Sequence, residues 1–82
     1  MRQTTKSKVY YTQRWKRFRK MVLSASPLCV ECEKRGDVEP GVDLDHIIPL
    51  DKGGAPYDRA NVQPLCKFHH GRKTRREERQ VT

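Results

Sequence analysis

Cys29-Val-Glu-Cys32 and Cys66-Lys-Phe-His69 are the two stretches that decide how this chain folds. They are separated by 33 residues, and each carries two soft metal ligands with two residues between them. Three thiolates and one imidazole suit tetrahedral zinc, whereas redox use of the first cysteine pair would not explain the second stretch. The spacing therefore predicts one structural Zn²⁺, held by Cys29, Cys32, Cys66 and His69. Two alternatives stay open: Cys66 is an ordinary buried thiol, or another residue supplies the fourth ligand.

A chain of this size is expected to need a structural staple such as a bound metal ion. It has 82 residues, of which 34% are hydrophobic, and a core of that size leaves only about 3–5 kcal/mol of net stability. Three cysteines cannot all pair within one chain, and the polar stretch Met1 to Lys8 does not resemble a signal peptide. We therefore expect a soluble protein of a reducing cytoplasm, because no apolar run is long enough to span a membrane either.

The charge is divided along the chain in a way that suggests a polyanionic partner. Residues 1–35 carry ten basic against two acidic side chains, residues 36–66 carry two against six, and residues 67–82 carry six against two. The two basic segments could hold a phosphate backbone on both sides of the acidic central segment, and the acidic segment could bind a cation. The alternatives are that surface charge only keeps the protein soluble, or that it serves a ribosome or a membrane surface.

The first periodic segment predicts an amphipathic helix with basic outer faces. It is expected to begin at the N-cap Thr12 and to stop at Ser24-Ala-Ser-Pro27, since Pro27 disfavours helical geometry at the residue before it. Its apolar stripe is expected to be core, with base stacking by Trp15 as the alternative. The stripe consists of Tyr11, Trp15, Phe18 and Val22. Residues 1–11 are expected to be a basic flexible arm, and residues 12–82 a single domain.

The rest of the chain reads as short elements separated by turn signals. Residues 27–32 are expected to form a tight turn and residues 33–41 a loop. Residues 42–50 alternate in part between apolar and acidic side chains, which predicts a strand that ends near Pro49. The elements expected after it are a turn at 51–54, one helical turn at 57–60, an extended segment at 61–65, and a basic helix from Phe68 or His69 to about Arg79.

Four further residues lie in and just after the loop that the zinc would close. Asp45 offers a carboxylate and His70 an imidazole, so together they can hold a divalent ion with positions left for water and phosphate oxygens. His46 is then free to act as a general base, provided the strand twists or bends so that both neighbours reach one site. Asn61 can orient the loop or the His46 imidazole, or it can simply form a turn or cap a helix.

In these motifs the sequence resembles the HNH endonucleases, whose fold is the ββα-metal (His-Me) finger. The resemblance spans about residues 28–74 and rests on Leu-Cys-x2-Cys, Asp45-His-Ile-Ile-Pro-Leu50, Gly53-Gly54, Asn61, Leu65-Cys-x2-His-His70 and Lys73. It implies a small α+β fold: a ββα-metal core with a structural zinc knuckle and an N-terminal amphipathic helix. The zinc-stapled members usually have Cys where His69 stands here. A Cys3His site keeps tetrahedral chemistry, although His69 and His70 could exchange roles.

The resemblance also implies a role for each residue. Asp45 and His70 would bind the catalytic divalent ion, His46 would be the general base and Asn61 would support it. Mg²⁺ or Mn²⁺ would suit that site, and Ni²⁺ or Zn²⁺ are further candidates. The side chains expected to hold neighbouring DNA phosphates are Arg72, Lys73, Arg75 and Arg76.

The expected function is a metal-dependent DNA endonuclease that nicks or cuts DNA with weak sequence preference, since no separate element for reading bases is visible. Small members of this family are often encoded by bacteriophages and act beside the terminase, so the resemblance implies the terminase large subunit as a partner of a monomeric enzyme. A restriction-type or mobile-element nuclease is an alternative origin. The competing class is a zinc-dependent nucleic-acid-binding module that does no chemistry, and an enzyme active only with its partner is a third possibility.

Overall fold

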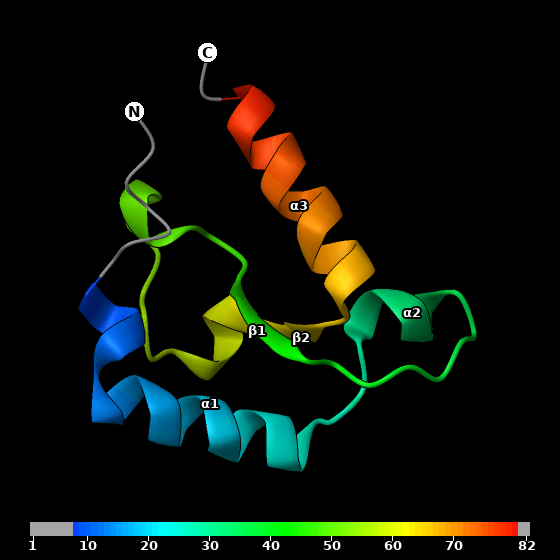
Figure 1. Cartoon of the computed structure of the whole chain (residues 1–82), viewed down its shortest axis with the longest axis horizontal. Coiled ribbons are helices and arrows are strands. Elements are labelled where there is room, and N and C mark those ends of the chain that lie inside the picture. Colours follow the sequence, from blue (N-terminus) through cyan, green and yellow to red (C-terminus); the bar gives the residue numbers. More distant parts are fainter. Residues whose placement is uncertain (1–7, 81–82) are drawn as a thin grey trace.

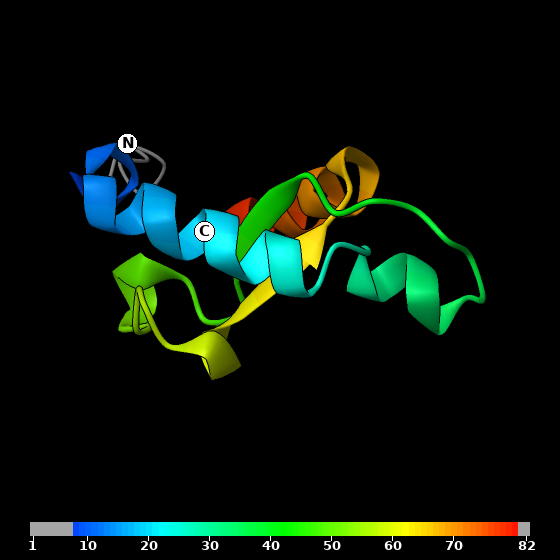
Figure 2. The same cartoon turned by 90° about the horizontal axis from the view of Figure 1, so that it is seen from below.

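Two antiparallel strands, β1 (Asp43–His46) and β2 (Val62–Leu65), form the centre of the fold. The structure is a computed structural model that describes residues 8–80. In the register of the strands Asp43 lies opposite Leu65 and His46 opposite Val62. Helix α1 (Gln13–Ala25) runs below this sheet in Figure 1, and helix α3 (Lys67–Gln80) rises above it, so the sheet lies between the two long helices (Figures 1 and 2). The predicted small α+β class is confirmed.

Helix α1 follows its prediction closely. The Thr12 hydroxyl caps it by accepting a 3.1 Å hydrogen bond from the Trp15 backbone N–H, and the helix ends at Ala25, two residues before Pro27. Trp15 and Val22 are buried in a core that also contains Leu44 and Val62, and Phe18 packs against it. The prediction that Tyr11 belongs to this stripe is wrong: its side chain is 68% exposed because it lies before the cap, outside the helix.

The segment before α1 differs from the predicted arm of residues 1–11. Lys8–Tyr11 form a 3₁₀ turn, η2, in which Val9 and Tyr10 pack against the core. The Tyr10 ring stands edge-on to Trp15 with 5.4 Å between the ring centroids. Hydrophobic contact therefore ties this end of the predicted arm to the domain, while residues 1–7 lie outside the described residues.

The first cysteine stretch forms a short helix, α2 (Val30–Lys34), where the sequence predicted a tight turn and a loop. Cys29 is its N-cap, because the Cys29 sulfur accepts a hydrogen bond from the Cys32 N–H at 3.5 Å. Glu31 and Glu33 lie in the first turn, where acidic side chains stabilise a helix. The chain then returns toward the sheet through one isolated bridge between Leu28 and Pro40.

The strand predicted over 42–50 is shorter in the structure and ends at His46. Beyond it, Ile47 and Ile48 are about half exposed. The Ile48 N–H donates to the Asn61 side-chain oxygen instead of to the backbone of a partner strand. Two 3₁₀ turns follow in the connection to β2: η3 (Leu50–Lys52) and η4 (Arg59–Asn61). The second lies slightly later than the helical turn predicted at 57–60, because Asp58 caps it by accepting from the Ala60 N–H at 2.9 Å.

Helix α3 begins directly after Cys66, one or two residues earlier than predicted, and none of its described side chains is fully buried. This agrees with its low hydrophobic content. None of the described helices is both long and apolar enough to cross a membrane.

Asn61 holds the β1–β2 connection closed. Its carbonyl oxygen accepts from the Ile48 N–H at 2.8 Å, and its amide donates to the carbonyl oxygens of Ile48 at 3.1 Å and Ala55 at 3.0 Å. Gly54 lies directly in this clamp. A Cβ atom there would stand 1.8 Å from the Ile48 carbonyl oxygen and 2.9 Å from the Asn61 amide nitrogen.

Replacing Gly54 with Ala should therefore lower the free energy of unfolding by about 1–3 kcal/mol, because the clamp must open to admit a methyl group. Gly71→Ala is the matched control. Its Cβ meets only the end of the Arg75 side chain at 3.4 Å, and Ala at this helical position should stabilise the protein by about 0.5–1 kcal/mol. Urea denaturation measures both, and a neutral or stabilising Gly54→Ala would contradict the clamp.

Candidate active site and metal centre

The four residues predicted to share a zinc ion come together at one place. Cys29 and Cys32 approach from α2, and Cys66 and His69 approach from the start of α3. One ligand atom from each lies within 4.8 Å of all the others. The cluster is largely buried and packs against Leu65, so it forms a second small core beside the aromatic one.

The spacing of these atoms fits a tetrahedral zinc ion. Bond lengths of about 2.3 Å to sulfur and 2.0–2.1 Å to nitrogen place two sulfur ligands about 3.8 Å apart, and a sulfur and a nitrogen about 3.6 Å apart. The Cys32 and Cys66 sulfurs are 3.8 Å apart. The His69 Nδ1 lies 3.8, 3.5 and 3.3 Å from the sulfurs of Cys29, Cys32 and Cys66. His69 therefore faces the cluster through Nδ1.

The thiols show why this cluster needs a cation. Burial raises the pKa of Cys29, but hydrogen bonds from the backbone at Cys32 and Cys66 more than offset this effect and lower the pKa to about 7. Burial, together with the neighbouring Cys29 and Cys66 thiols, raises the pKa of Cys32 to about 12. One thiolate forms readily and the next is opposed by its neighbours, so a bound divalent ion would supply the charge that allows all three to ionise.

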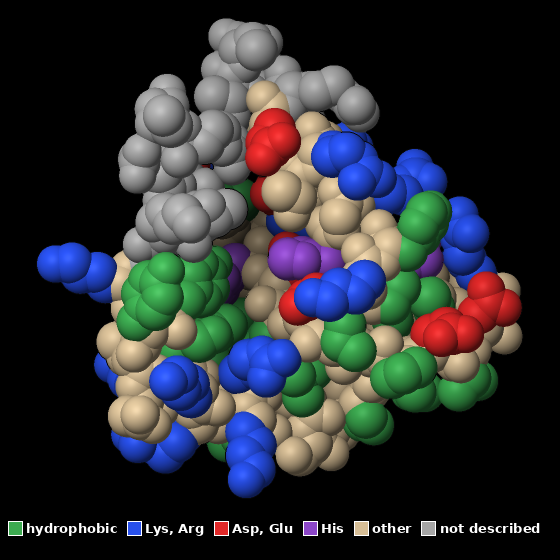
Figure 3. Space-filling view, in the orientation of Figure 1, with side chains coloured by type: hydrophobic (Ala, Val, Ile, Leu, Met, Phe, Trp, Pro, Cys, Tyr) green, Lys and Arg blue, Asp and Glu red, His purple; other side chains and the backbone are tan. Residues whose placement is uncertain are grey.

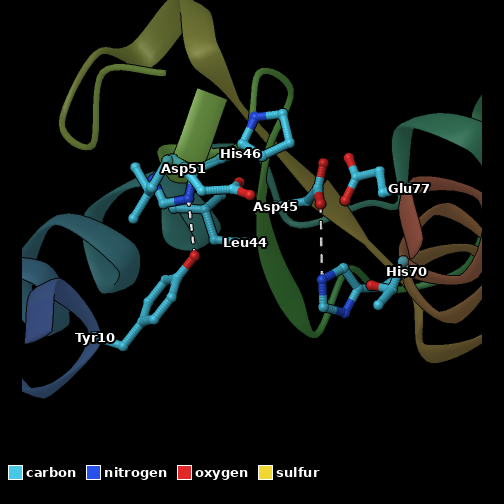
Figure 4. Close-up of a pocket in the computed structure, with 10 residues that line it drawn as sticks. Tyr10, Leu44, Asp45, His46, Asp51, His70 and Glu77 are labelled. Atoms are coloured by element: carbon cyan, nitrogen blue, oxygen red, sulfur yellow. Dashed lines mark hydrogen bonds and ion pairs between the residues drawn. The ribbon is translucent and has the colours of Figure 1, made fainter. Parts of the chain in front are cut away.

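A separate cavity of about 240 Å³ brings together three of the four other residues predicted for the reacting site (Figure 4). Asp45 and His46 reach it from the end of β1, and His70 reaches it from the first turn of α3. The requirement that adjacent Asp45 and His46 reach one site is met, because both side chains line this cavity. Its other lining residues are Tyr10, Leu44, Pro49, Leu50, Asp51, Thr74 and Glu77.

His46 is buried and held at both ring nitrogens. Nε2 lies 3.1 Å from the Pro56 carbonyl oxygen, and Nδ1 lies 3.2 Å from the Tyr10 hydroxyl. A carbonyl oxygen only accepts, so Nε2 carries the proton in the neutral ring and the Nδ1 lone pair accepts from Tyr10. The ring also packs beside Trp15, with 4.9 Å between centroids. A neutral His46 thus presents a basic nitrogen to the cavity.

Asp45 and His70 face each other across the cavity. The His70 Nε2 lies 3.7 Å from one Asp45 carboxylate oxygen, and the Gln63 amide donates to the other at 3.1 Å. Two ligands bound at about 2.1 Å to one octahedral ion lie about 3.0 Å apart at neighbouring positions, so a small movement lets both reach one ion. On its other side, the His70 Nδ1 lies 3.3 Å from Asp43 Oδ2, a buried oxygen without a hydrogen bond.

Lys73 lines a hollow together with Arg72 and Arg76, but it is largely buried, unlike the three exposed arginines with which it was predicted to bind DNA. Its side chain is only 15% exposed and lies in ion-pair contact with Asp45, at 3.3 Å, and with Glu77. Its ammonium group also donates to the His46 carbonyl oxygen at 3.0 Å. Lys73 therefore lies beside the cavity, where its ammonium group balances the carboxylates of Asp45 and Glu77.

Arg72, Arg75 and Arg76 are exposed on the other side of α3. With Phe68 they line a different hollow of about 330 Å³. They do not reach the cavity that holds Asp45, His46 and His70.

Asn61 contacts the connection after β1 and makes no hydrogen bond to the His46 ring. Of the alternatives drawn from the sequence, the structure therefore favours orientation of the loop. One of its bonds goes to the Ala55 carbonyl, next to the Pro56 carbonyl that receives the His46 ring. Asn61 thus acts on His46 through the backbone.

Tyr10 is the main residue of the cavity that the sequence did not reveal. Burial raises the pKa of its hydroxyl, and the carboxylates of Asp45, Glu77 and Asp51 raise it further, so the group stays a neutral donor. The signal that could have found it is the apolar run Val9-Tyr10-Tyr11 directly before the N-cap, a position that often packs back on the helix. Asp43 and Glu77 were missed because nothing in their spacing marks them.

Comparisons with known proteins agree on one family. A sequence model of the HNH endonuclease family matches residues 29–76. The Gene 4 protein of Mycobacterium phage D29 is 35% identical over 60 residues, which cover 73% of this chain and 57% of that protein. The chain thus spans little more than half of that relative. The crystal structure of the HNH endonuclease of the deep-sea thermophilic bacteriophage GVE2 with manganese ion matches with a TM-score of 0.75 and 35% identity, covering 89% of this chain and 82% of that one.

Removing a metal bound by the Cys3His cluster should unfold the domain, because the cluster joins the start of α2 to the start of α3. Treatment with a strong chelator, or Cys29→Ser, should abolish the helical circular dichroism signal. His69→Cys is the matched variant, since a fourth thiolate preserves tetrahedral coordination, and it should keep both zinc and helicity. Full helicity in a sample shown by elemental analysis to be free of zinc would contradict this role.

Proposed function

Because the chain belongs to the HNH endonuclease family, we propose that it is a metal-dependent DNA endonuclease in which the cavity between β1 and α3 cuts a phosphodiester bond. Residues 12–82 act as one nuclease domain in this proposal, with η2 packed onto it. The Cys3His cluster holds a structural Zn²⁺ that takes no part in the chemistry, and the cavity holds a separate divalent ion. Mg²⁺ or Mn²⁺ suits the cavity, since one imidazole and carboxylate oxygens form a hard ligand set.

The observation that carries the proposal is the arrangement of His46. Its Nε2 proton is committed to the Pro56 carbonyl, so Nδ1 is the atom that can accept a proton inside the cavity once a water molecule replaces the Tyr10 hydroxyl at its lone pair. In the proposed reaction Nδ1 removes a proton from a water molecule as the water oxygen attacks phosphorus. The bond from phosphorus to the 3′ oxygen then breaks, which leaves a 5′ phosphate and, once protonated, a 3′ hydroxyl.

Asp45 and His70 are the proposed ligands of the cavity ion. When bound there, a divalent ion stabilises negative charge on the attacked phosphate and on the leaving 3′ oxygen. The second oxygen of Asp45 is held by Gln63 and Lys73, which leaves the first directed toward His70. The Asp43 carboxylate faces the His70 Nδ1, on the side of the ring away from Asp45. Carboxylates commonly orient metal-binding imidazoles in this way.

DNA is the proposed substrate because basic surface surrounds the acidic cavity. Figure 3 shows histidine and acidic side chains near the centre of one face, with Lys and Arg side chains around them over α1 and α3. Contacts of this kind hold phosphates without reading bases, so we expect nicking or cutting with weak sequence preference. Arg72, Arg75 and Arg76 bind phosphates in this proposal, at a distance from the cavity.

The similarity to two phage proteins supports a phage origin. We extend the proposal to a monomer that acts in the host cytoplasm beside the terminase large subunit during DNA packaging. Purified terminase large subunit should raise the cutting rate of the wild-type chain. An unchanged rate, with no complex detected by sedimentation, would remove the terminase from the proposal and leave the nuclease in place.

His46→Ala and His70→Ala should each lower the rate of plasmid nicking in magnesium or manganese, because the first removes the base and the second a metal ligand. We expect a loss of about 10²–10⁴-fold for His46→Ala, with unchanged circular dichroism. If wild type and both variants bind DNA and none cuts it with any divalent ion, even with terminase large subunit added, the domain is a binding module. Cutting that survives His70→Ala but not His69→Cys would mean that the two histidines exchange roles.

Tyr10→Phe should lower the rate constant of nicking by about 2- to 10-fold without weakening DNA binding, because it removes only the hydroxyl that holds the His46 ring in position before a water molecule takes the Nδ1 lone pair. Single-turnover rates measured at saturating protein report the rate constant of nicking without any contribution from DNA affinity. Tyr11→Phe, next to it but 68% exposed, is the control and should cut like wild type. An unchanged rate in Tyr10→Phe would show that the hydroxyl does not assist the base.

A further inference from the structure

Helix α3 presents two opposite faces that differ in chemistry. His70, Thr74 and Glu77 line the cavity, whereas Phe68, Arg72 and Arg75 line the hollow of about 330 Å³. At about 100° per residue, the second set lies on the far side of the helix from the first. The proposed cutting chemistry thus uses only one side of α3, whereas the proposed function gives the arginines on the other side no more than general contacts with DNA phosphates.

Phe68 is an unusual residue for that outer face. Its side chain is 59% exposed and belongs to neither hydrophobic core. The ring contacts His69 edge-on, with 5.1 Å between centroids, and the Arg72 guanidinium carbon lies 5.8 Å from the ring centroid. Core packing does not explain this aromatic ring, which is left open to solvent among cationic side chains.

The arginines around the Phe68 ring have no acidic partners among the described residues. Within residues 8–80, Arg72, Arg75 and Arg76 form no ion pair with an acidic side chain, while Lys73 on the cavity side is paired twice. Figure 3 shows basic side chains along the outer edge of α3 with hydrophobic surface among them. An exposed aromatic ring among unpaired arginines is complementary to a nucleic acid whose bases are not paired. Such a base can stack on the ring while the arginines hold the phosphates.

We propose that the outer face of α3 binds an unpaired stretch of DNA, with one base stacked on Phe68 and the adjacent phosphates held by Arg72, Arg75 and Arg76. Duplex DNA satisfies the phosphate contacts but keeps its bases stacked on each other, so it gains nothing from the ring. The surface is separate from the cavity, and binding there does not depend on whether the cavity cuts DNA. A nuclease with such a face would prefer DNA in which duplex adjoins single strand.

The test is equilibrium binding of fluorescein-labelled oligothymidylate of about 16 nucleotides, and of a duplex of the same length, to the zinc-loaded protein. No magnesium or manganese is added, and gel analysis confirms that the DNA stays intact. Phe68→Leu keeps an apolar side chain but removes the ring. It should weaken binding of the single strand by about fivefold or more and leave the duplex affinity unchanged.

Two further variants keep the result decisive. Arg75→Gln lies away from the zinc ligands and should reduce the salt dependence of single-strand binding by about 0.7 in the slope of log K against log salt. Tyr11→Leu, an equally exposed aromatic outside this face, should bind like wild type. The proposal is overturned if oligothymidylate does not bind, if Phe68→Leu weakens single strand and duplex equally, or if Tyr11→Leu has the effect of Phe68→Leu.

Discussion

The Cys3His cluster is the constraint on which the rest of the structure depends. The aromatic core between α1 and the sheet contains only a few buried side chains, and the sheet has two strands of four residues each. Such a core alone is marginal at this chain length. The cluster joins the start of α2 to the start of α3, and Leu65 at the end of β2 packs directly against it. The position of β2 and the direction in which α3 leaves the sheet both follow from this junction.

The same junction positions the cavity. His69 and His70 are neighbours in the first turn of α3, yet His69 faces the sulfur atoms and His70 faces Asp45. Successive residues of a helix point about 100° apart, so a metal that holds His69 also fixes the direction of His70. On the opposite side of the cavity, Asn61 and Gly54 hold the connection that carries the Pro56 carbonyl to His46. The stability of the fold and the proposed chemistry are therefore coupled through the adjacent residues His69 and His70.

Much of this was predictable because the informative residues have fixed spacing. The two ligand stretches, the amphipathic helix with its Thr12 cap and the Asp45-His46 pair are local patterns, and each lies close to where it was expected. Contacts between distant segments were not predictable. Tyr10 reaches His46 across 36 positions, and Lys73 pairs with Asp45, which lies 28 positions before it in the sequence. The shortened β1 has a similar cause, since the Asn61 side chain takes the N–H that would have continued the strand.

The central claim is that two metal sites with different tasks lie on either side of the first turn of α3. Metal analysis after dialysis of zinc-loaded protein against manganese tests it most directly. We expect one zinc ion and one manganese ion per chain in the wild type, and one zinc ion without manganese in His70→Ala. Displacement of zinc by manganese in the wild type, or loss of zinc from His70→Ala, would contradict the division between a structural site and a reacting one.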